Sequence, residues 1–446
     1  MGNKRAAAIL VLGDLNRSPR MLNHSKAVSE NMPEIEEISL IGFNGGELRS
    51  DITTDTKIKV YYIPDRINNI LKKLPRIFFV LSAIVRILLQ IFFLTYILLF
   101  KIPRPSFLIL QNPPGIPAIY ICSIVCFLRR TTFIIDWHNY GYTIMEVNKR
   151  NRIATWIAKI YEKVYGRCSS LNFCVSNSMK YHLKNEMNIE AINLPDRAMK
   201  NVFKKLSLCE SHYFFKKYEE TRDLFTETIL ENGHEIIKYK SNRPILMISS
   251  TSWTPDEDFD LLLDSLIETE NKLLRSHEES IIKKVILIIT GRGPNRDEFM
   301  KKVFKTNFKI FTIRSIWLES DDYPKLLGAS DIGICLHYSS SGYDLPMKVV
   351  DMFSAQLPVV SYDYETVHEL INQNTNGFLF KNGEDLSRIL TDLIQEFSLN
   401  NKSEKINAFS NNLKNFSSDD WISQWKKLAY DRIIKLLKFK LKFHKE

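Results

Sequence analysis

Short apolar runs alternate with longer amphipathic segments along most of the chain. The runs at residues 6–12, 107–110, 133–135, 171–175, 245–248, 285–289, 332–336 and 359–361 are rich in aliphatic residues and are bounded by polar or turn residues. Runs of this length without polar alternation are typical of strands that are buried on both faces of a parallel sheet. Their alternation with helical patterns predicts parallel βα units, and therefore an α/β fold.

The series of βα units is interrupted once. Between residues 201 and 243 the composition becomes charged and aromatic without a strand pattern, and a new series begins at Pro244. We therefore predict two doubly wound, Rossmann-like domains at residues 1–200 and 244–415, joined by a variable linker at 201–243. Residues 416–446 place apolar and basic positions on opposite faces, which predicts a closing basic helix, either packed on the protein or lying on a membrane.

One apolar segment is unusually long. Residues 77–100 read IFFVLSAIVRILLQIFFLTYILLF, and these 24 residues exceed the ~20 that a helix needs to cross a bilayer. Ser82, Arg86 and Gln90 recur every four residues and would form one polar stripe on that helix. A spanning helix would also place the strands before and after it on opposite sides of the membrane. The segment therefore predicts a helix that lies in the membrane surface, with a buried core helix and a spanning helix as alternatives.

Charge and composition narrow the class of protein. Hydrophobic residues make up 45% and charged residues 25% of the chain, which excludes a disordered protein. The chain carries 61 Lys and Arg against 51 Asp and Glu, a net charge of +10 that favours an anionic partner. Among anionic partners, nucleic acid is less favoured than phosphate compounds or anionic lipid, because the basic residues are dispersed rather than clustered with aromatic residues.

The loops that follow the predicted strands carry the candidate chemistry, because ligands of open α/β sheets bind beyond the carboxyl ends of the strands. The loop after the first strand contains Asp14, Arg17 and Arg20, two guanidinium groups and a carboxylate beside free backbone donors. Such a loop could bind a diphosphate. Asp14 is also a candidate base, and a capped helix start with surface arginines is the simpler alternative.

A second loop of the N-terminal half reads DWHNYGY at residues 136–142. It places a carboxylate, an imidazole and several hydrogen-bonding side chains within seven residues. Asp136 and His138 are therefore candidates, with Asp14, for the general base that takes a proton from an acceptor hydroxyl, and Asn139 is a candidate for binding substrate. A structural histidine is the alternative for His138.

In the C-terminal half, two strands end in small residues that let a ligand approach the backbone. Ser250 and Thr251 end or follow one strand, and Gly291 follows the next. The richest segment is HYSSSGYDLPMKVVDMF at residues 337–353, where a hydroxyl-rich glycine loop leads into a helix. It predicts a nucleotide and phosphate site at His337, Ser341, Gly342, Asp344, Lys348 and Asp351. A surface ion pair of Lys348 and Asp351 is the alternative for the last two.

Five of these segments together resemble a known family. GDLNRSPRM, DWHNYGY, SSTSWTPDEDF, ITGRGP and HYSSSGYDLPMKVVDMF are similar to motifs of the eukaryotic chitobiosyldiphosphodolichol β-mannosyltransferase family. The resemblance implies a GT-B glycosyltransferase, in which two Rossmann-like domains flank a cleft. It also implies an inverting transfer of mannose from GDP-mannose to the terminal GlcNAc of GlcNAc2-diphosphodolichol, which forms a β-1,4 linkage on the cytosolic face of the endoplasmic reticulum membrane.

The resemblance also distributes roles between the two halves. It implies that Ser341, Gly342, Lys348 and Asp351 hold the nucleotide diphosphate, and that Asp14, Arg17, Arg20 and His138 face the lipid-linked acceptor. Asp344 and Asp351 stand where many GT-B enzymes have two glutamates seven positions apart. The resemblance leaves room for a complex with other mannosyltransferases of the pathway.

No tightly bound cofactor or metal is expected, because backbone amides, a helix N-terminus and basic side chains can stabilise a nucleoside diphosphate leaving group. Asp256, Glu257 and Asp258 read as the acidic first turn of a helix rather than a metal cluster. The sequence does not determine whether added Mg²⁺ is needed. Two other functions remain as alternatives: another GT-B nucleotide-sugar transferase, such as an α-mannosyltransferase, and a non-catalytic GT-B scaffold.

Overall fold

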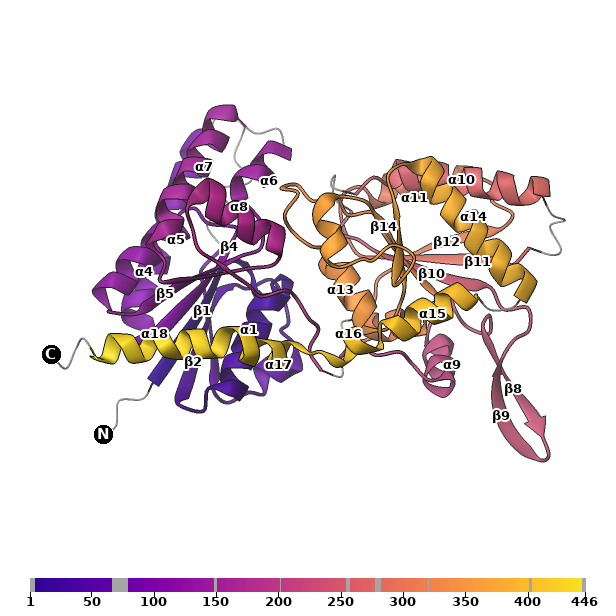
Figure 1. Ribbon diagram of the computed structural model, residues 1–446, viewed down its shortest axis with the longest axis horizontal. Coiled ribbons are helices and arrows are strands. Elements are labelled where there is room, and N and C mark those ends of the chain that lie inside the picture. The colour runs from indigo at the N-terminus through magenta and orange to yellow at the C-terminus, as the bar shows by residue number, and fades with distance from the viewer. Residues whose placement is uncertain are drawn as a thin grey trace. The chain divides into compact units, whose positions relative to one another are not determined.

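The computed structural model describes residues 5–65, 79–147, 151–200, 202–253, 257–276, 282–319, 321–400 and 403–442. The chain divides into two compact units. The first unit comprises Met1–Asp196 and Trp421–Glu446, and the second comprises Arg197–Asp420. Figure 1 shows that the helical segment that begins at Trp421, in the brightest yellow, belongs with the indigo and purple elements of the first unit.

The first unit is built on a seven-stranded parallel sheet. In chain order its strands are β1 (Arg5–Asp14), β2 (Ile35–Phe43), β3 (Ile58–Tyr62), β4 (Pro105–Asn112), β5 (Thr132–Trp137), β6 (Leu171–Cys174) and β7 (Ile192–Asn193). Across the sheet the order is β3-β2-β1-β4-β5-β6-β7. β1 lies inside the sheet, between β2 and β4, and its residues 6–12 are buried, which explains the uninterrupted apolar run in this segment.

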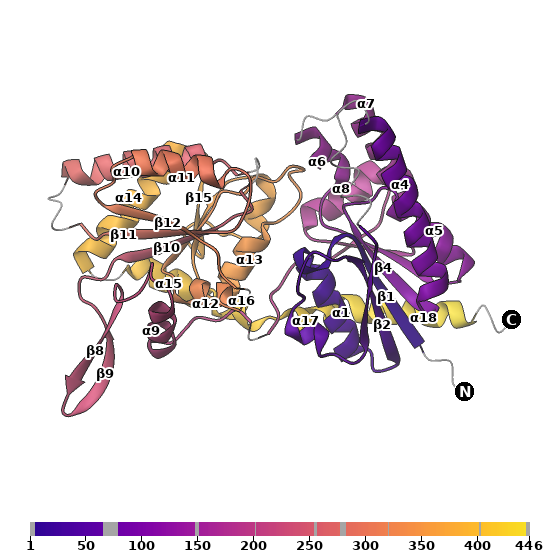
Figure 2. The same ribbon diagram turned by 180° about the vertical axis from the view of Figure 1, so that it is seen from behind.

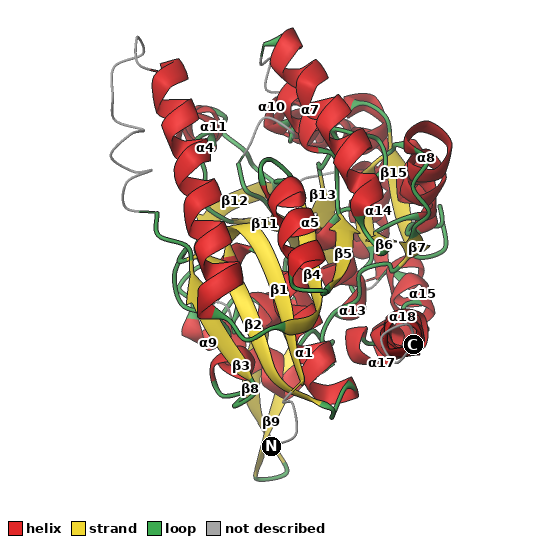
Figure 3. Ribbon diagram, turned by 90° about the vertical axis from the view of Figure 1, so that its left-hand side faces the viewer, coloured by secondary structure: helices red, strands yellow, loops and turns green. Residues whose placement is uncertain are grey.

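Helices cover both faces of this sheet. Figure 3 shows one face covered by α4 (Phe79–Tyr96), α5 (Ala118–Leu128) and α7 (Arg152–Tyr165). α4 continues into the π-helical turn η3 (Ile97–Lys101). Three further helices of the unit are α6 (Gly141–Val147), α8 (Asn177–Met187) and the short α2 (Ser50–Thr53). The 3-10 turn η1 (Leu15–Arg17) leads into α1 (Pro19–Asn31), and the turn η4 (Gly166–Cys168) precedes β6. α1 contacts α17 (Trp421–Trp425) and the π-helical turn η6 (Lys426–Tyr430), which α18 (Asp431–Lys442) follows.

The long apolar segment forms a helix that lies against the first unit. Within the described residues, Ile84–Lys101 is the one stretch long and apolar enough to cross a membrane, and only 17% of it is buried. β1 pairs with both β2 and β4, so strands on either side of this helix belong to one sheet. The helix therefore does not span a bilayer, because the strands before and after it belong to one sheet. It is not a buried core helix either, because most of it is exposed. Residues 77 and 78 of the predicted segment lie outside the described residues.

The second unit is a three-layer arrangement around a six-stranded parallel sheet. Its strands are β10 (Ile245–Ser250), β11 (Val285–Thr290), β12 (Phe311–Ile316), β13 (Ile332–Cys335), β14 (Val359–Tyr362) and β15 (Gly377–Phe380), in the order β12-β11-β10-β13-β14-β15. One hydrophobic cluster packs the sheet against α10 (Phe259–Ser276), α11 (Arg296–Lys305) and α14 (Gly383–Asn400). Another packs the opposite face against α9 (Leu208–Lys217), α12 (Tyr323–Ala329) and α13 (Met347–Ser354). Figure 2 shows α10 and α12 on opposite sides of these strands.

The segment predicted as a linker, 201–243, is part of the second unit and contains regular structure. α9 and the antiparallel hairpin of β8 (Thr226–Glu231) and β9 (His234–Tyr239) lie in it. The two residues between these strands, Asn232 and Gly233, have positive φ angles of 54° and 78°, as a type I′ hairpin turn requires. The segment belongs to the unit because Phe214, Phe215 and Phe225 are buried in its core.

The C-terminal boundary also differs from the predicted one. α15 (Glu404–Asn412) and α16 (Lys414–Ser418) belong to the second unit, and the chain returns to the first unit at Trp421, whereas the closing helix was predicted to begin at residue 416. The reason is local packing: Trp421 and Trp425 are both fully buried, and both pack beside α1. Two buried indoles hold this segment in place more strongly than the basic positions from which the helix was predicted.

Candidate active site

Both sheets place their candidate residues at a topological switch point. The strand order reverses between β1 and β4 in the first unit, and between β10 and β13 in the second. Ligands of open α/β sheets bind at the carboxyl ends of the strands at such points. Asp14 ends β1 and His138 follows β5, which neighbours β4, while Ser250 ends β10 and His337 lies just beyond β13. The candidate site residues of each unit therefore lie at the carboxyl-end edge of its sheet.

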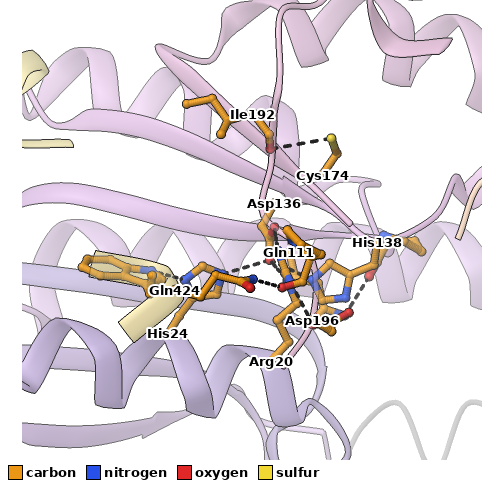
Figure 4. Close-up of polar contacts among 12 residues, drawn as sticks. Arg20, His24, Gln111, Asp136, His138, Cys174, Ile192, Asp196 and Gln424 are labelled. Carbon is orange, nitrogen blue, oxygen red and sulfur yellow. Dashed lines mark hydrogen bonds and ion pairs between the residues drawn. The ribbon is translucent and has the colours of Figure 1, made fainter. Parts of the chain in front are cut away.

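A buried carboxylate organises the edge of the first sheet. The guanidinium of Arg20 donates from Nε and Nη2 to the two oxygens of Asp136, at 2.7 and 2.8 Å, and from Nη1 to Asp196 at 2.7 Å. His24 and His138 each place Nε2 near the same Asp136 oxygen, at 3.0 and 2.8 Å. Figure 4 shows these side chains converging on Asp136. One carboxylate thus binds an arginine and two histidines.

The charges in this cluster follow from burial and from these contacts. Burial alone would raise the pKa of Asp136, but Arg20, His138 and His24 together lower it well below its usual range. Burial would lower the pKa of Arg20, and the two aspartates raise it instead. Burial lowers the pKa of His24 despite its contact with Asp136. At neutral pH, Asp136 is therefore ionised and His24 is neutral.

These protonation states assign the hydrogens in the cluster. Trp425 donates its indole N–H to Nδ1 of His24 at 3.0 Å, so His24 carries its proton on Nε2 and donates it to Asp136. An ionised Asp136 can only accept, so His138 must also donate from Nε2. In its neutral form His138 then has a free lone pair on Nδ1. His138 is partly exposed, with 22% of its side chain accessible, whereas Asp136 and His24 are fully buried.

Arg20 differs from the prediction that it faces the acceptor. Its side chain is 2% exposed and its guanidinium is held by two carboxylates, so it is not presented to a diphosphate. The reason is its position in α1, which turns residue 20 towards the sheet and away from the loop. Arg20 instead neutralises Asp136 and Asp196, which come from segments distant in the sequence.

The other predicted residues of the first unit lie at its surface or cap a helix. Asp14 and Arg17 are 39% and 80% exposed, and Arg17 Nε lies 3.8 Å from the Asp14 carboxylate. Both therefore remain accessible to a ligand. Asn139 accepts from the backbone N–H of Tyr140 at 2.7 Å and from the Thr143 hydroxyl at 3.3 Å, which orders the first turn of α6.

A buried carboxyl group near His138 was not anticipated. Glu162 of α7 is 1% exposed, and its Oε1 accepts from the N–H of Gly141 at 2.9 Å and from the Asn112 amide at 3.0 Å. The carbonyl of Asn112 in turn accepts from the N–H of His138 at 2.8 Å. Burial raises the pKa of Glu162 to about 7. Its helical position among polar and charged residues gave no sign of this environment.

This carboxyl group makes the stability of the chain depend on pH. A raised pKa means that stability is fully present below the ordinary pKa of 4.5 and is lost as the pH rises through about 7. Glu162→Gln mimics the protonated group, so the variant should gain up to about 3 kcal/mol over the wild type at pH 8 and nothing at pH 4.5. Chemical denaturation at both pH values measures this. If the difference in unfolding free energy between the Gln variant and the wild type is the same at pH 4.5 and pH 8, the prediction is wrong.

In the second unit, Asp344 organises the serine-rich loop. Its Oδ1 accepts from the hydroxyls of Ser339 and Ser341, and its Oδ2 lies 3.3 Å from Nε2 of His337. The Ser339 hydroxyl accepts from the N–H of Gly342 at 2.8 Å. Gly342 has φ of +77°, a conformation that favours glycine and explains why this residue ends the serine run. The predicted loop residues are thus brought together around one carboxylate, whose oxygens they occupy.

Lys348 forms an ion pair with Glu257, a residue that was not considered as its partner. Its ammonium contacts Oε1 of Glu257, whose Oε2 accepts from the Thr251 hydroxyl and, at 3.2 Å, from the N–H of Ser252. Glu257 is 2% exposed and Lys348 24%. Sequence reasoning assigned Glu257 to the first turn of a helix, but α10 begins later, at Phe259, and Asp256 lies outside the described residues. Glu257 is therefore a site residue that the sequence pattern concealed.

The remaining predicted residues lie where these strands end. Gly291 follows β11 with φ of +126°, and an added Cβ would lie 1.8 Å from the Thr251 carbonyl oxygen, so only glycine fits. Ser250 is buried at the end of β10. Asp351 lies on α13 beside Tyr323, and burial together with this carboxylate raises the pKa of the Tyr323 phenol. The residues of the second unit thus gather at the ends of β10, β11 and β13.

The two edges offer different chemistry. The first unit presents a half-buried histidine that is oriented by an ionised aspartate, which is a geometry suited to accepting a proton. The second presents a lysine, hydroxyls and a glycine turn, which suit an anionic ligand. In the part of the chain that the structure describes, no three His, Cys, Asp or Glu side chains gather as a metal site.

Comparison with known proteins identifies the family. The profile of the family described as "Glycosyl transferases group 1" matches residues 235–415. The solved structure of a glycosyltransferase from Rickettsia africae ESF-5 superposes with a TM-score of 0.64 at 14% identity, covering 99% of this chain and 100% of that one. This likeness confirms the predicted GT-B fold.

Two curated relatives cover almost the whole chain. The UDP-glycosyltransferase TURAN of Arabidopsis thaliana is 30% identical, over 96% of this chain and 97% of its own length. The chitobiosyldiphosphodolichol β-mannosyltransferase of Homo sapiens is 35% identical, over 94% of this chain and 91% of its own length. The resemblance that the motifs indicated is thereby confirmed, and the chain belongs to the chitobiosyldiphosphodolichol β-mannosyltransferase family.

Proposed function

We propose that this chain transfers a mannosyl residue from GDP-mannose to the terminal sugar of chitobiosyl-diphosphodolichol, with inversion at the anomeric carbon. A hydroxyl of the acceptor attacks C1 of the mannosyl group, the bond from C1 to the phosphate oxygen breaks, and GDP leaves. The acceptor proton passes to a general base. The observation that carries the proposal is family membership together with the Asp136–His138 pair at the switch point of the first sheet.

His138 is the base in this proposal. Its Nε2–H is held by the ionised Asp136, which leaves Nδ1 as the acceptor of the proton and stabilises the imidazolium that forms. Asp136, which is fully buried and contacts no substrate, is a positioning residue. Asp14 is accessible at the neighbouring strand end, and we assign it, with Arg17, to binding of the acceptor.

The second unit binds the donor in this proposal. Lys348, which is partly exposed, offsets the charge of the diphosphate as GDP leaves. Asp351, on the same helix, accepts from the ribose hydroxyls. The site requires no tightly bound cofactor, and the effect of added Mg²⁺ or EDTA on the rate tests that part of the proposal.

Lys348 must be tested together with its partner Glu257. Lys348→Met leaves a buried carboxylate unpaired, so its loss of activity alone is ambiguous. Lys348→Met with Glu257→Gln removes both charges. If Lys348 contacts the diphosphate, the double variant should still lose about 10–100-fold in kcat/KM for the donor, the value of a charged hydrogen bond. Recovery of wild-type kcat/KM in the double variant would show that Lys348 serves only to neutralise Glu257.

The lipid nature of the acceptor places this reaction at a membrane. We propose the cytosolic face of the endoplasmic reticulum, where a dolichol-linked chitobiose and a soluble nucleotide sugar meet, and where a complex with other mannosyltransferases of the pathway can form. Fractionation of the native host, with protease added to intact microsomes, tests the side of the membrane. Protection of the chain from protease would contradict a cytosolic orientation.

The proposed donor, GDP-mannose, has a specific alternative, a UDP-sugar. One full-length relative bears the name of a UDP-glycosyltransferase, so GDP- and UDP-sugars are the donors to compare. The purified chain, incubated with a chitobiosyl diphosphate lipid and each nucleotide sugar in turn, should use GDP-mannose at least about tenfold faster than the others, since one hydrogen bond between the base and a charged group contributes about 1.5–3 kcal/mol. Preferred use of a UDP-sugar would replace the proposed donor.

A further inference from the structure

α7 has its apolar and polar faces reversed relative to a helix of a soluble protein. Its inward side, towards the sheet, carries Thr155, Ala158 and Glu162, all of them buried. Its outward side carries large apolar residues at helical spacing, exposed by between 40% and 68%: Ile153, Trp156, Ile157, Ile160 and Val164. A surface helix ordinarily turns such a stripe to the core. Here the stripe faces away from it.

α4 also presents an apolar outer side. The polar stripe noted in the sequence is turned inward, since Ser82 is buried and accepts, through its carbonyl, a hydrogen bond from Nε of the half-buried Arg86 at 3.3 Å. The outward side carries Leu88, and further along Phe92 and Phe100, which are 63% and 74% exposed. The inner side also buries Leu94, Ile97 and Leu98, so this stretch is apolar on both sides. A helix with an apolar outer side is suited to an apolar environment.

α5 joins these two helices into one surface. It contacts both α4 and α7, and Figure 3 shows the three helices side by side on one face of the seven-stranded sheet. Its own outward residues, Phe127 and Leu128, are 83% and 62% exposed. The apolar surface therefore extends over three helices, which is far more than the scattered exposed residues of an ordinary protein surface.

Basic residues lie around this apolar surface. Lys159 and Lys163 on α7 are exposed, as are Lys101 and Arg104 beyond α4 and Arg130 beyond α5. A second copy of the chain would bring these like charges together across a shared interface, which is unfavourable. Anionic lipid headgroups would instead be attracted to them. The charges thus favour a lipid surface over self-association.

We propose that α4, α5 and α7 together form a membrane-contact surface, which we name the three-helix face, and that it lies in one leaflet without crossing the bilayer. The exposed side chains of α4, α5 and α7 enter the boundary between headgroups and acyl chains, and the basic residues contact the headgroups. The membrane contact is thus shared by α7, where no membrane segment was predicted, and is not confined to the long apolar helix. The proposal requires no catalytic step and stands apart from the proposed reaction.

Flotation of the purified full-length chain with vesicles tests this surface. Ile157→Glu with Ile160→Glu places two charges in the exposed stripe of α7 without touching a buried residue. The wild type should float with vesicles of phosphatidylcholine and phosphatidylserine, and the double variant should bind at least about tenfold more weakly. Phe304→Glu is the matched control, because Phe304 is 77% exposed on α11 of the second unit, and it should float like the wild type.

Two results would overturn the proposal. Equal flotation of the α7 variant and the wild type would restrict the membrane contact to α4. A wild type that does not float but dimerises in solution, with dimerisation abolished by the α7 variant, would identify a second copy as the occupant of the three-helix face. Transfer to a water-soluble, short-chain acceptor by the same variant, measured without vesicles, should equal that of the wild type, which separates this surface from the catalytic residues.

Discussion

Replacing His138 with alanine should lower kcat by about 10²–10⁴-fold, the range that a general base contributes, while KM for GDP-mannose stays nearly unchanged. The reason is geometric: Asp136 fixes Nε2–H of His138, so Nδ1 is the atom that accepts the proton. Steady-state kinetics on a chitobiosyl diphosphate lipid measures both constants.

Two further variants make this test specific. Asp14→Ala should raise KM for the acceptor more than it lowers kcat, because Asp14 is assigned to binding. His234→Ala, a substitution at the exposed hairpin of the second unit, should leave both constants unchanged. If Asp14→Ala abolishes turnover while His138→Ala retains activity, the base is Asp14 and the assignment to His138 is wrong.

Arg20→Leu should destabilise the chain by about 3–5 kcal/mol, the loss expected when one partner of a buried ion pair is removed. Arg20 is 2% exposed and makes three short hydrogen bonds to Asp136 and Asp196. Without it, the buried Asp136 and Asp196 both lose their arginine partner. For a unit of this size the melting temperature should fall by roughly 10 °C, which thermal unfolding followed by circular dichroism detects.

Arg17→Leu provides the matched control for Arg20. Arg17 lies three residues before Arg20, in the 3-10 turn that follows the first strand, and its side chain is 80% exposed. A weak surface contact of this kind contributes at most about 1 kcal/mol, so the melting temperature of this variant should not change appreciably. Equal stability of the two variants would mean that Arg20 is not needed to neutralise the buried aspartates.

The sequence predicted eight strands and missed the four at the sheet edges, together with the interior strand β2, whose apolar run is interrupted by Glu36 and Glu37. All eight predicted runs are strands of the two parallel sheets, because strands buried on both faces must be continuously apolar. β3 and β12 lie at sheet edges, where polar residues are tolerated and the apolar run is broken. The hairpin of β8 and β9 was missed although Asn232-Gly233 is a strong turn signal. Its strands are largely exposed and contain charged residues, so they lack the continuous apolar run of a buried strand.

The candidate site was predictable in place but not in pairing. Position at a strand end can be read from the sequence, and Asp14, His138, Thr251 and Gly291 all lie at one. Which residues contact each other depends on tertiary packing, and so Arg20 paired with Asp136 and Lys348 with Glu257 without a local signal. The role of Trp425 at His24 was the least predictable, since 401 positions separate them.

The central claim is that this chain forms a β-linked mannoside from GDP-mannose. The most direct measurement is transfer from radiolabelled GDP-mannose to a synthetic chitobiosyl diphosphate lipid, followed by release of the trisaccharide and digestion with α- and β-mannosidases. We predict a product whose label is released by β-mannosidase and retained after α-mannosidase. Label released by α-mannosidase, or no transfer by a folded preparation that binds GDP, would contradict the account.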